Sequence, residues 1–463
     1  MSHGNDVATH AMADRRPRRE VFGEPLARLL VVSGVLFVLA IGLVGMVVHR
    51  APQLSIFDEP THSDYAYQIS HGHVPAKGST IAPEILKEWS CHGYFDGSKL
   101  PPCAGPPTPA ILYPKLGQDY NFVHPPLYYA ITGVIARVAD AALPGNSHFI
   151  TLARLVGSLW LFAAMLVLYL AVRRLGARWQ LAAAAALLLP LCPQVLLAST
   201  TVTNDAPAAL CGSLAVLMLA RIMVQRKLGW IIPALVTGLS AATKVLNALP
   251  MLSLAAVIAV VAIIAWREDH RMQARKLALI VLGVIAATAI VYVGWAAFQA
   301  GRGVAGWKSP IQGISDRPIV GSPVDDLFST SLTGLQMISD FFVPDQLRST
   351  WFTLWVRLLS FFAVAAPLVL LAVTQKREVE RRLAGATLFG MVSYPIIVEL
   401  QVYINGRNYF PSVPSRYGMS IIPLLIACLA LAAHRLGMQR SMLTGVGVGA
   451  GVTLAAAAGL FHS

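Results

Sequence analysis

Long apolar runs separated by short polar stretches form the dominant pattern of this chain. Each run approaches the length of about 20 residues with which an α-helix crosses a bilayer. Backbone groups find no partners in lipid, so such runs are expected to be helical. The pattern predicts an all-α integral membrane protein of about eleven spanning helices. We expect them at 29–48, 151–172, 179–198, 206–224, 229–243, 248–266, 277–298, 352–374, 384–402, 417–433 and 442–461.

Charges at the ends of these segments predict how the chain is oriented. If the N-terminus is cytoplasmic, every short inner connection is basic, as the positive-inside rule requires. We therefore expect a basic cytoplasmic tail at 1–28 and one polytopic membrane domain at 29–463, with its C-terminus outside. Within that domain, two long extracytoplasmic loops are expected at 49–150 and 299–351. The basic connections lie at 173–174, 226–227, 267–276, 376–382 and 435–440.

Composition agrees with this membrane class. Hydrophobic residues make up 56% of the chain and charged residues only 13%, about half the charged share of a soluble domain. The formal net charge of +13 lies mostly in lysines and arginines between apolar runs. Topology and contact with anionic membrane lipids explain these charges, and we expect no nucleic-acid partner.

The first long loop has two expected structural features. Residues 125–142 predict a short interfacial helix, because Arg137 and Asp140 make this segment a poor membrane span. Cys91 and Cys103 lie in the same loop. If the loop is extracytoplasmic, a disulfide between these two cysteines is expected.

Unusual polar residues collect at the outer ends of the expected helices, although they are far apart in sequence. A helix bundle would bring several of them together around one cavity. The acid pair Asp58 and Glu59 follows the first span and is the proposed catalytic element. The candidate substrate-binding residues are His62, His124, Tyr128, Asn204, Asp205, Lys244, Arg407 and Arg416.

These residue types suit one kind of chemistry. A carboxylate such as Asp58 can act as general base toward an acceptor hydroxyl that attacks a sugar carbon. Lysine and arginine can hold the phosphate of a lipid-phosphate leaving group and stabilise its developing charge. Arginine suits bidentate capture of phosphate, whereas lysine acts as a point charge.

Each candidate also has an ordinary structural interpretation. Asp58 is suited to capping a short helix, and Asp205 ahead of Ala-Pro resembles another helix cap. Lys244 can extend its ammonium group to the membrane interface. Anionic outer-leaflet lipids would equally account for Arg407 and Arg416.

Metal binding is not expected. Several histidines occupy the first loop, but they lack the close ligand spacing and the Cys-His pattern of a zinc site. We therefore predict no metal and no cofactor.

The order of these short motifs resembles the GT-C glycosyltransferase superfamily over about residues 29–433. The relatives in view are protein O-mannosyltransferases, the aminoarabinose transferase of lipid A and a group of uncharacterised GT-C-like membrane proteins. The motifs are Asp58-Glu59-Pro60-Thr61-His62, His124-Pro125-Pro126-Leu127-Tyr128-Tyr129, Asn204-Asp205, Thr243-Lys244 and Gly406-Arg407-Asn408-Tyr409-Phe410-Pro411.

This resemblance implies a polyprenyl-phosphate sugar as donor and an aspartate of the first outer loop as catalytic base. Carried over, Asp58 is the base and Glu59 stands beside it, whereas Lys244, Arg407 and Arg416 become candidate contacts of the donor phosphate. The expected activity is inverting transfer of the sugar to an extracytoplasmic glycan, lipid or protein. The alternatives are a transporter or flippase of lipid-linked glycans and a non-catalytic scaffold of the cell envelope. The identity of the sugar and of the acceptor stays open.

Overall fold

The structure is a computed structural model. It describes residues 25–56, 58–94, 97–106, 108–143, 148–311, 316–333, 349–375 and 377–460. The predicted cytoplasmic tail, apart from residues 25–28, lies outside these described residues.

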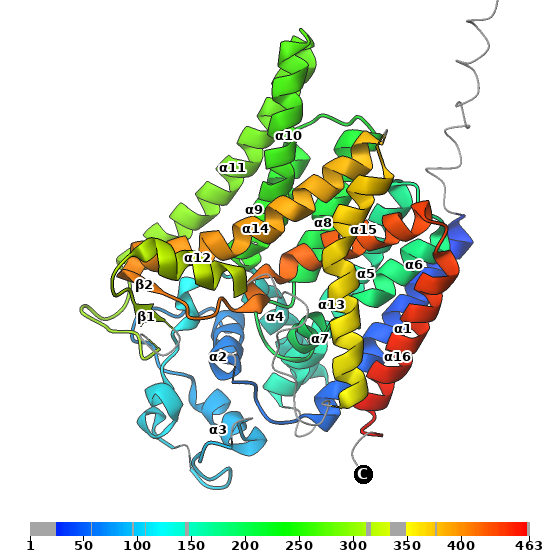
Figure 1. The fold of residues 1–463 in the computed structure, drawn as a ribbon. Coiled ribbons are helices and arrows are strands. Elements are labelled where there is room, and N and C mark those ends of the chain that lie inside the picture. The colour runs from blue at the N-terminus through cyan, green and yellow to red at the C-terminus, as the bar shows by residue number, and fades with distance from the viewer. Residues whose placement is uncertain are drawn as a thin grey trace, which may run out of the picture.

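The described chain folds into a bundle of helices with a layer of shorter elements at one end (Figure 1). The α-helices are α1 (Leu26–Arg50), α2 (Glu59–Ser70), α3 (Pro83–His92), α4 (Leu127–Ala142), α5 (Phe149–Arg174), α6 (Trp179–Leu188), α7 (Pro193–Thr200), α8 (Ala208–Leu219), α9 (Ile231–Thr243), α10 (Leu249–Arg267), α11 (Arg271–Ala300), α12 (Pro323–Thr333), α13 (Thr350–Val373), α14 (Glu378–Gly406), α15 (Ile422–Arg435) and α16 (Gln439–Ala457). Shorter helical turns are η1 (Ala110–Leu112), η2 (Pro114–Gly117), η3 (Asn121–Val123), η4 (Ala220–Val224), η5 (Val245–Ala248) and η7 (Ser415–Ile421).

The structure confirms the predicted membrane spans only in part. Among the described residues, 7 helices are long and apolar enough to cross a membrane, or up to 8 if one bent pair counts as a span. That pair is α6 and α7, which meet at 64°. The segments Ala208–Val224 and Ile231–Thr243 are shorter apolar helices, and α16 is not one of the seven. The protein is thus a multi-pass membrane protein, but eleven full-length spans are not confirmed.

Helix α5 is central to the bundle, where it packs against α1, α4, α6, α7 and α8. Helices α10 and α11 lie side by side and project beyond the other helices, whereas α2 and α3 lie toward the opposite end (Figure 1). We call the end that carries α2 and α3 the loop end. The connection between α10 and α11 holds Arg267 and Arg271 and was predicted to be cytoplasmic; this orientation stays a prediction.

The interfacial helix expected at 125–142 forms as α4. One of its faces is buried and carries Tyr128, Tyr129 and Gly133, whereas Val134 and Val138 on the other face are exposed. An apolar exposed face on a helix too short to span agrees with a position against the membrane interface.

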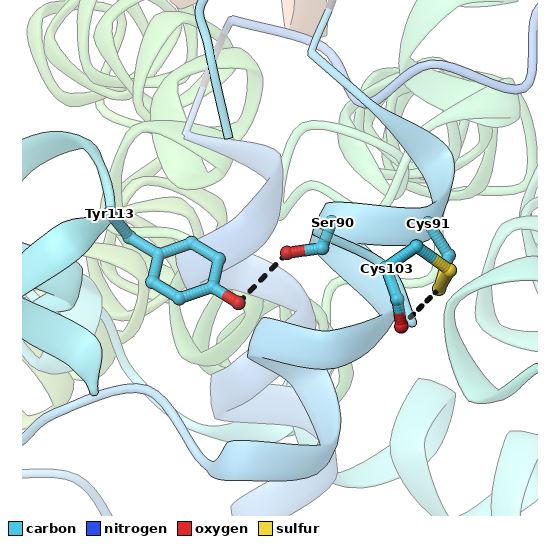
Figure 2. The surroundings of a disulfide bond; sticks show 4 residues. All are labelled: Ser90, Cys91, Cys103 and Tyr113. Atoms are coloured by element: carbon cyan, nitrogen blue, oxygen red, sulfur yellow. Dashed lines mark hydrogen bonds between the residues drawn. A yellow bond between two sulfur atoms is a disulfide. The ribbon is translucent and has the colours of Figure 1, made fainter. Parts of the chain in front are cut away.

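Two contacts at the C-terminal end of α3 hold the first long loop together. Cys91 and Cys103 form a disulfide, and the hydroxyl groups of Ser90 and Tyr113 lie 2.8 Å apart (Figure 2). Tyr113 begins the segment that leads into η2. The disulfide and this hydrogen bond therefore tie α3 to the stretch of loop that approaches Asp58.

A small sheet departs from the predicted all-α fold. Strand β1 (Arg317–Pro318) pairs antiparallel with β2 (Asn408–Tyr409). The Asn408 side chain also donates to Asp316 at 2.6 Å. These contacts fasten the second long loop to the end of α14.

Helices α2 and α4 approach closely because position 133 has no side chain. A Cβ atom placed on Gly133 would lie 2.0 Å from the backbone oxygen of Ala66, whereas one on Gly238 would lie 3.8 Å from the Cβ atom of Ala287. Helix α2 carries the first candidate residues, so this contact positions them relative to α4.

Gly133→Ala is expected to push α4 away from α2 and to destabilise the protein by about 1–3 kcal/mol, the usual cost of overpacking. Thermal unfolding in detergent micelles measures this loss. Gly238→Ala is the matched control and is expected to be neutral or slightly stabilising, because Ala favours helix and has room there. Equal melting temperatures for the two variants would contradict the expectation.

Candidate functional site

Asp58 lies at the start of α2 and holds three groups at once. Its backbone adopts the left-handed conformation, with φ 60° and ψ 19°. Its Oδ1 atom accepts hydrogen bonds from Lys115 Nζ at 3.0 Å and from the Tyr120 hydroxyl at 2.6 Å. Its Oδ2 atom lies 3.8 Å from a guanidinium nitrogen of Arg416. The loop segment at 115–120 and the segment with Arg416, both distant in sequence from Asp58, therefore meet at this carboxylate.

Lys115 reaches Asp58 from a strained piece of backbone. Lys115 and Leu116 both have positive φ, at 56° and 59°, which costs about 1–2 kcal/mol for each non-glycine residue. The side chain of Leu116 is exposed. That of Lys115 points into the site, where it also donates a hydrogen bond to the Tyr120 hydroxyl at 2.7 Å. Strain of this kind, at a residue that binds the candidate base, points to a functional role.

A second ion pair lies deeper than the first. Lys244 contacts Asp205, and their side chains are only 6% and 5% exposed, compared with 20% for Asp58 and 22% for Arg416. The ring of Tyr417 connects the two pairs, since Lys244 lies 4.8 Å and Arg416 lies 5.4 Å from its centroid. The site therefore has an accessible side at Asp58 and a buried side at Asp205.

Two histidines occupy the space between these pairs. The rings of His62 and His124 stack with centroids 6.1 Å apart, and His62 Nδ1 lies 2.8 Å from the Tyr129 hydroxyl. Burial lowers the pKa of each imidazole to about 3, despite the carboxylates of Asp58 and Asp205 near His62. Both rings are therefore neutral at physiological pH and can donate or accept hydrogen bonds without adding charge.

Tyr128 and Asn204 take part in contacts that hold the turn next to Asp205. The Tyr128 hydroxyl accepts from the backbone N–H of Thr203 at 3.0 Å, and the Asn247 side chain lies 3.5 Å from the backbone oxygen of Asn204. Both contacts hold the turn that presents Asp205. The structure thus places these two candidates in the support of the site.

Glu59 points away from Asp58 into a buried ion pair. Its carboxylate binds Arg154 through two hydrogen bonds of 2.7 and 2.8 Å, and it also accepts from the backbone N–H groups of Ser55 and Val202. Arg154 in turn donates to the backbone oxygens of residues 51, 52 and 53. These contacts fix Glu59 in the fold, and the catalytic role predicted for it beside Asp58 stays a prediction.

Arg407 lies apart from the other candidates. Its side chain is exposed and contacts Tyr403, while its backbone oxygen accepts from Ile319 at 3.2 Å. These contacts belong to the junction between the second long loop and α14. Nothing among its described contacts connects it to Asp58, so this arrangement does not support a phosphate contact by Arg407.

Three residues of the site were missed from the sequence. Lys115 and Tyr120 lie in a loop whose irregular backbone carries no periodic signal. Arg154 does carry one, because an arginine inside an apolar run is costly and usually paired. That signal predicts a buried acid as its partner, and Glu59 is that acid.

The site as a whole carries an excess of positive charge. Lys115, Lys244 and Arg416 face Asp58 and Asp205, which is three cations against two carboxylates, or one net positive charge. A phosphate group would balance this excess. Within the described residues, no group of three or more His, Cys, Asp or Glu side chains is placed to hold a metal ion.

Comparison with known proteins finds one family model that matches part of this chain. Residues 123–295 match the model of a family described as dolichyl-phosphate-mannose-protein mannosyltransferase. The chain resembles GT-C membrane glycosyltransferases. This match confirms the resemblance inferred from the short motifs, and its range includes His124, Arg154, Asp205 and Lys244 but neither Asp58 nor Arg416.

The crystal structure of ArnT from Cupriavidus metallidurans bound to undecaprenyl phosphate is similar over 94% of this chain and 77% of that one, with 14% sequence identity and a TM-score of 0.45. No curated protein matches the chain.

Glu59→Gln is expected to destabilise the protein by about 3–5 kcal/mol, because it leaves the buried guanidinium of Arg154 without its counter-charge. Thermal unfolding of the purified protein measures the loss. Glu378→Gln breaks an exposed pair with Arg382 on α14 and is expected to cost less than about 1 kcal/mol. A Glu59 variant as stable as the Glu378 variant would show that the buried pair does not anchor the loop.

Proposed function

We propose that the protein transfers a sugar from a polyprenyl-phosphate donor to an acceptor hydroxyl on the extracytoplasmic side of the membrane. One observation carries the proposal: a carboxylate and three cations from distant segments meet at the loop end of a membrane helix bundle. The resemblance to GT-C glycosyltransferases supports the same reaction class. No metal or cofactor is required in this proposal.

In the proposed reaction, Asp58 accepts the proton of the acceptor hydroxyl as its oxygen attacks the anomeric carbon of the sugar. The new carbon–oxygen bond forms while the bond from that carbon to the phosphate oxygen breaks. Attack from the opposite face inverts the anomeric configuration. Polyprenyl phosphate leaves with the bonding electrons, and its added charge is stabilised by Arg416 and Lys244.

The resting state favours the ionised form of Asp58. Burial by itself would raise the pKa of this carboxyl, but Arg416, Lys115 and the Tyr120 hydroxyl outweigh burial and lower the pKa to about 2. A carboxylate stabilised to this extent is a weak base. A donor phosphate that draws Arg416 toward itself would remove one of these cations and strengthen the base, so donor binding and activation of Asp58 are coupled.

Asp58→Asn is expected to reduce transfer from a lipid-linked sugar donor at least about a hundredfold, the lower range of general-base contributions. The assay uses purified protein in detergent or nanodiscs and a panel of polyprenyl-phosphate sugars. Asp325→Asn, on the exposed helix α12, is the matched control and should retain wild-type turnover. Undiminished turnover by the Asp58 variant would exclude Asp58 as the base.

Lys115→Met is expected to change the pH dependence of the reaction. Removing this cation raises the pKa of Asp58 from its value of about 2. The ionised base is present above its pKa and is lost as pH falls through it, so the acid limb of the rate profile should move to higher pH. Lys77→Met, in the same loop but bonded to Ala300, should leave the limb in place.

The Lys115 measurement separates two roles. A shift of the acid limb at unchanged donor KM indicates that Lys115 acts on the base. An unshifted limb with a raised donor KM would instead assign Lys115 to the phosphate and contradict the expectation.

A further inference from the structure

Two further acids, Asp64 and Asp119, are buried near the site and take no part in the proposed reaction. Asp64 on α2 and Asp119 in the following loop are both fully buried. The two carboxyl groups interact with each other, since each acts on the pKa of the other. Because two ionised carboxylates repel each other strongly when both are buried, the pair is expected to hold at least one proton.

The contacts of the pair indicate where that proton resides. Both oxygens of Asp64 accept from other donors, Oδ1 from the N–H of Ala82 at 2.8 Å and Oδ2 from the side chain of Gln68. Asp119 Oδ1 accepts from the N–H of Asn121 at 2.8 Å, whereas its buried Oδ2 has no donor. A buried carboxylate oxygen without a donor is costly, so we assign the proton of the pair to Asp119 Oδ2.

We propose that the Asp64–Asp119 pair is a proton-dependent fastener that positions Lys115 and Tyr120 against Asp58. Asp64 belongs to α2, the helix that begins directly after Asp58. Asp119 belongs to the loop segment that carries Lys115 and Tyr120. When the shared proton is present, the two elements are joined; when it is lost, two buried carboxylates repel each other.

The surrounding hydrogen bonds connect the pair to the base. The backbone N–H of Asp119 donates to Ser79 at 2.9 Å. The side chain of Asn121 donates to Thr61 at 2.6 Å, and the Thr61 hydroxyl donates to the backbone oxygen of Asp58 at 2.7 Å. Displacement of residues 119–121 would therefore move Tyr120 and loosen the backbone of Asp58 together.

Neighbouring groups favour the protonated form. Burial, with a smaller contribution from the carboxylate of Glu84 on α3, raises the pKa of Asp64 to about 7, although hydrogen bonds from Ala82 and Gln68 oppose this shift. Burial and the charge of Asp64 raise the pKa of Asp119 well above its usual value. Tyr65 and Tyr129, packed beside Asp119, have raised pKa values from burial and remain neutral; Arg302 is the cation that acts on Tyr65.

The sign of the pH effect follows from these shifts. A carboxyl whose pKa is raised in the folded state stabilises that state fully below its unfolded pKa. The contribution is lost as pH rises through the folded value. The fastener is therefore closed at acidic and neutral pH and opens on the alkaline side.

Asp119→Asn tests the fastener, because the amide donates to Asp64 as the protonated acid does but cannot titrate. Hydrogen–deuterium exchange of peptides covering 117–123 and 79–83 is compared with wild type at the same pH, from about pH 6 to about pH 9. We expect equal exchange at the lower pH and at least about tenfold faster exchange of the wild type at the upper pH. That factor corresponds to one pKa unit.

Further variants keep the test decisive. Asp64→Asn places an amide donor on the other partner and should also remove the pH dependence, whereas Asp119→Ala should exchange fast at every pH. Glu88→Gln changes another buried carboxyl of this loop, which accepts from the N–H groups of Phe149 and Ile150, and should follow the wild type. If wild type and Asp119→Asn show the same dependence on pH, the proposal is overturned.

Infrared spectroscopy gives a readout of the proton itself. The wild type is expected to show the band of a protonated carboxyl at neutral pH, and Asp119→Asn should lack it. An activity measurement rests on the proposed transferase function: the alkaline limb of the rate profile should move to higher pH in Asp119→Asn. Exchange and infrared results stand without that activity, so failure of the transferase proposal and failure of the fastener are distinguishable.

Discussion

The buried ion pair between Glu59 and Arg154 is the interaction on which the candidate site depends. Arg154 projects from the central helix α5 and binds both the acid and the three backbone oxygens of residues 51–53. Glu59 extends the same cluster to Val202 in the turn before Asp205. One pair thereby fixes the chain as it leaves α1, the first residue of α2 and the turn that presents the second carboxylate. A pair this buried is costly to form, and its value is in geometry more than in net stability.

The same pair holds the chain on both sides of Asp58. Arg154 binds the backbone oxygens of residues 51–53 and the Glu59 side chain, and Asp58, next to Glu59, adopts the left-handed region. A non-glycine residue there is strained unless its surroundings hold it. The contacts of its side chain with Lys115, Tyr120 and Arg416 supply that hold. The candidate base is therefore strained in its backbone, and its carboxylate is already in contact with three side chains. A bound anion can disturb this resting state.

The sequence predicted the parts of the site that lie at helix ends. Asp58, His62, Asp205, Lys244 and Arg416 follow or precede apolar runs, and helix packing brings such ends together, as the structure shows. Arg407 satisfied the same criterion, but the small sheet at 317–318 and 408–409 holds it elsewhere, and pairing of two-residue strands across distant loops leaves no periodic pattern. The same limit applies to Lys115, which owes its position to two left-handed residues. The predicted count of eleven spans is not confirmed for a related reason: hydropathy detects apolar runs but not the bend between α6 and α7 or the shortness of α9.

The two buried acid contacts on α2 restrict which parts of the site can move. Glu59 fastens the start of this helix to α5, and Asp64, farther along the same helix, fastens it to the loop at 117–121. The first contact is an ion pair, whereas the second depends on a single proton. A substrate that needs space beside Asp58 can gain it by displacing the segment with Lys115 and Tyr120, because moving α2 would expose Arg154 without its partner. Asp58 thus lies between α2, which the Glu59–Arg154 pair holds in place, and the segment with Lys115 and Tyr120, which can be displaced. We expect the substrate to enter on the side of that segment.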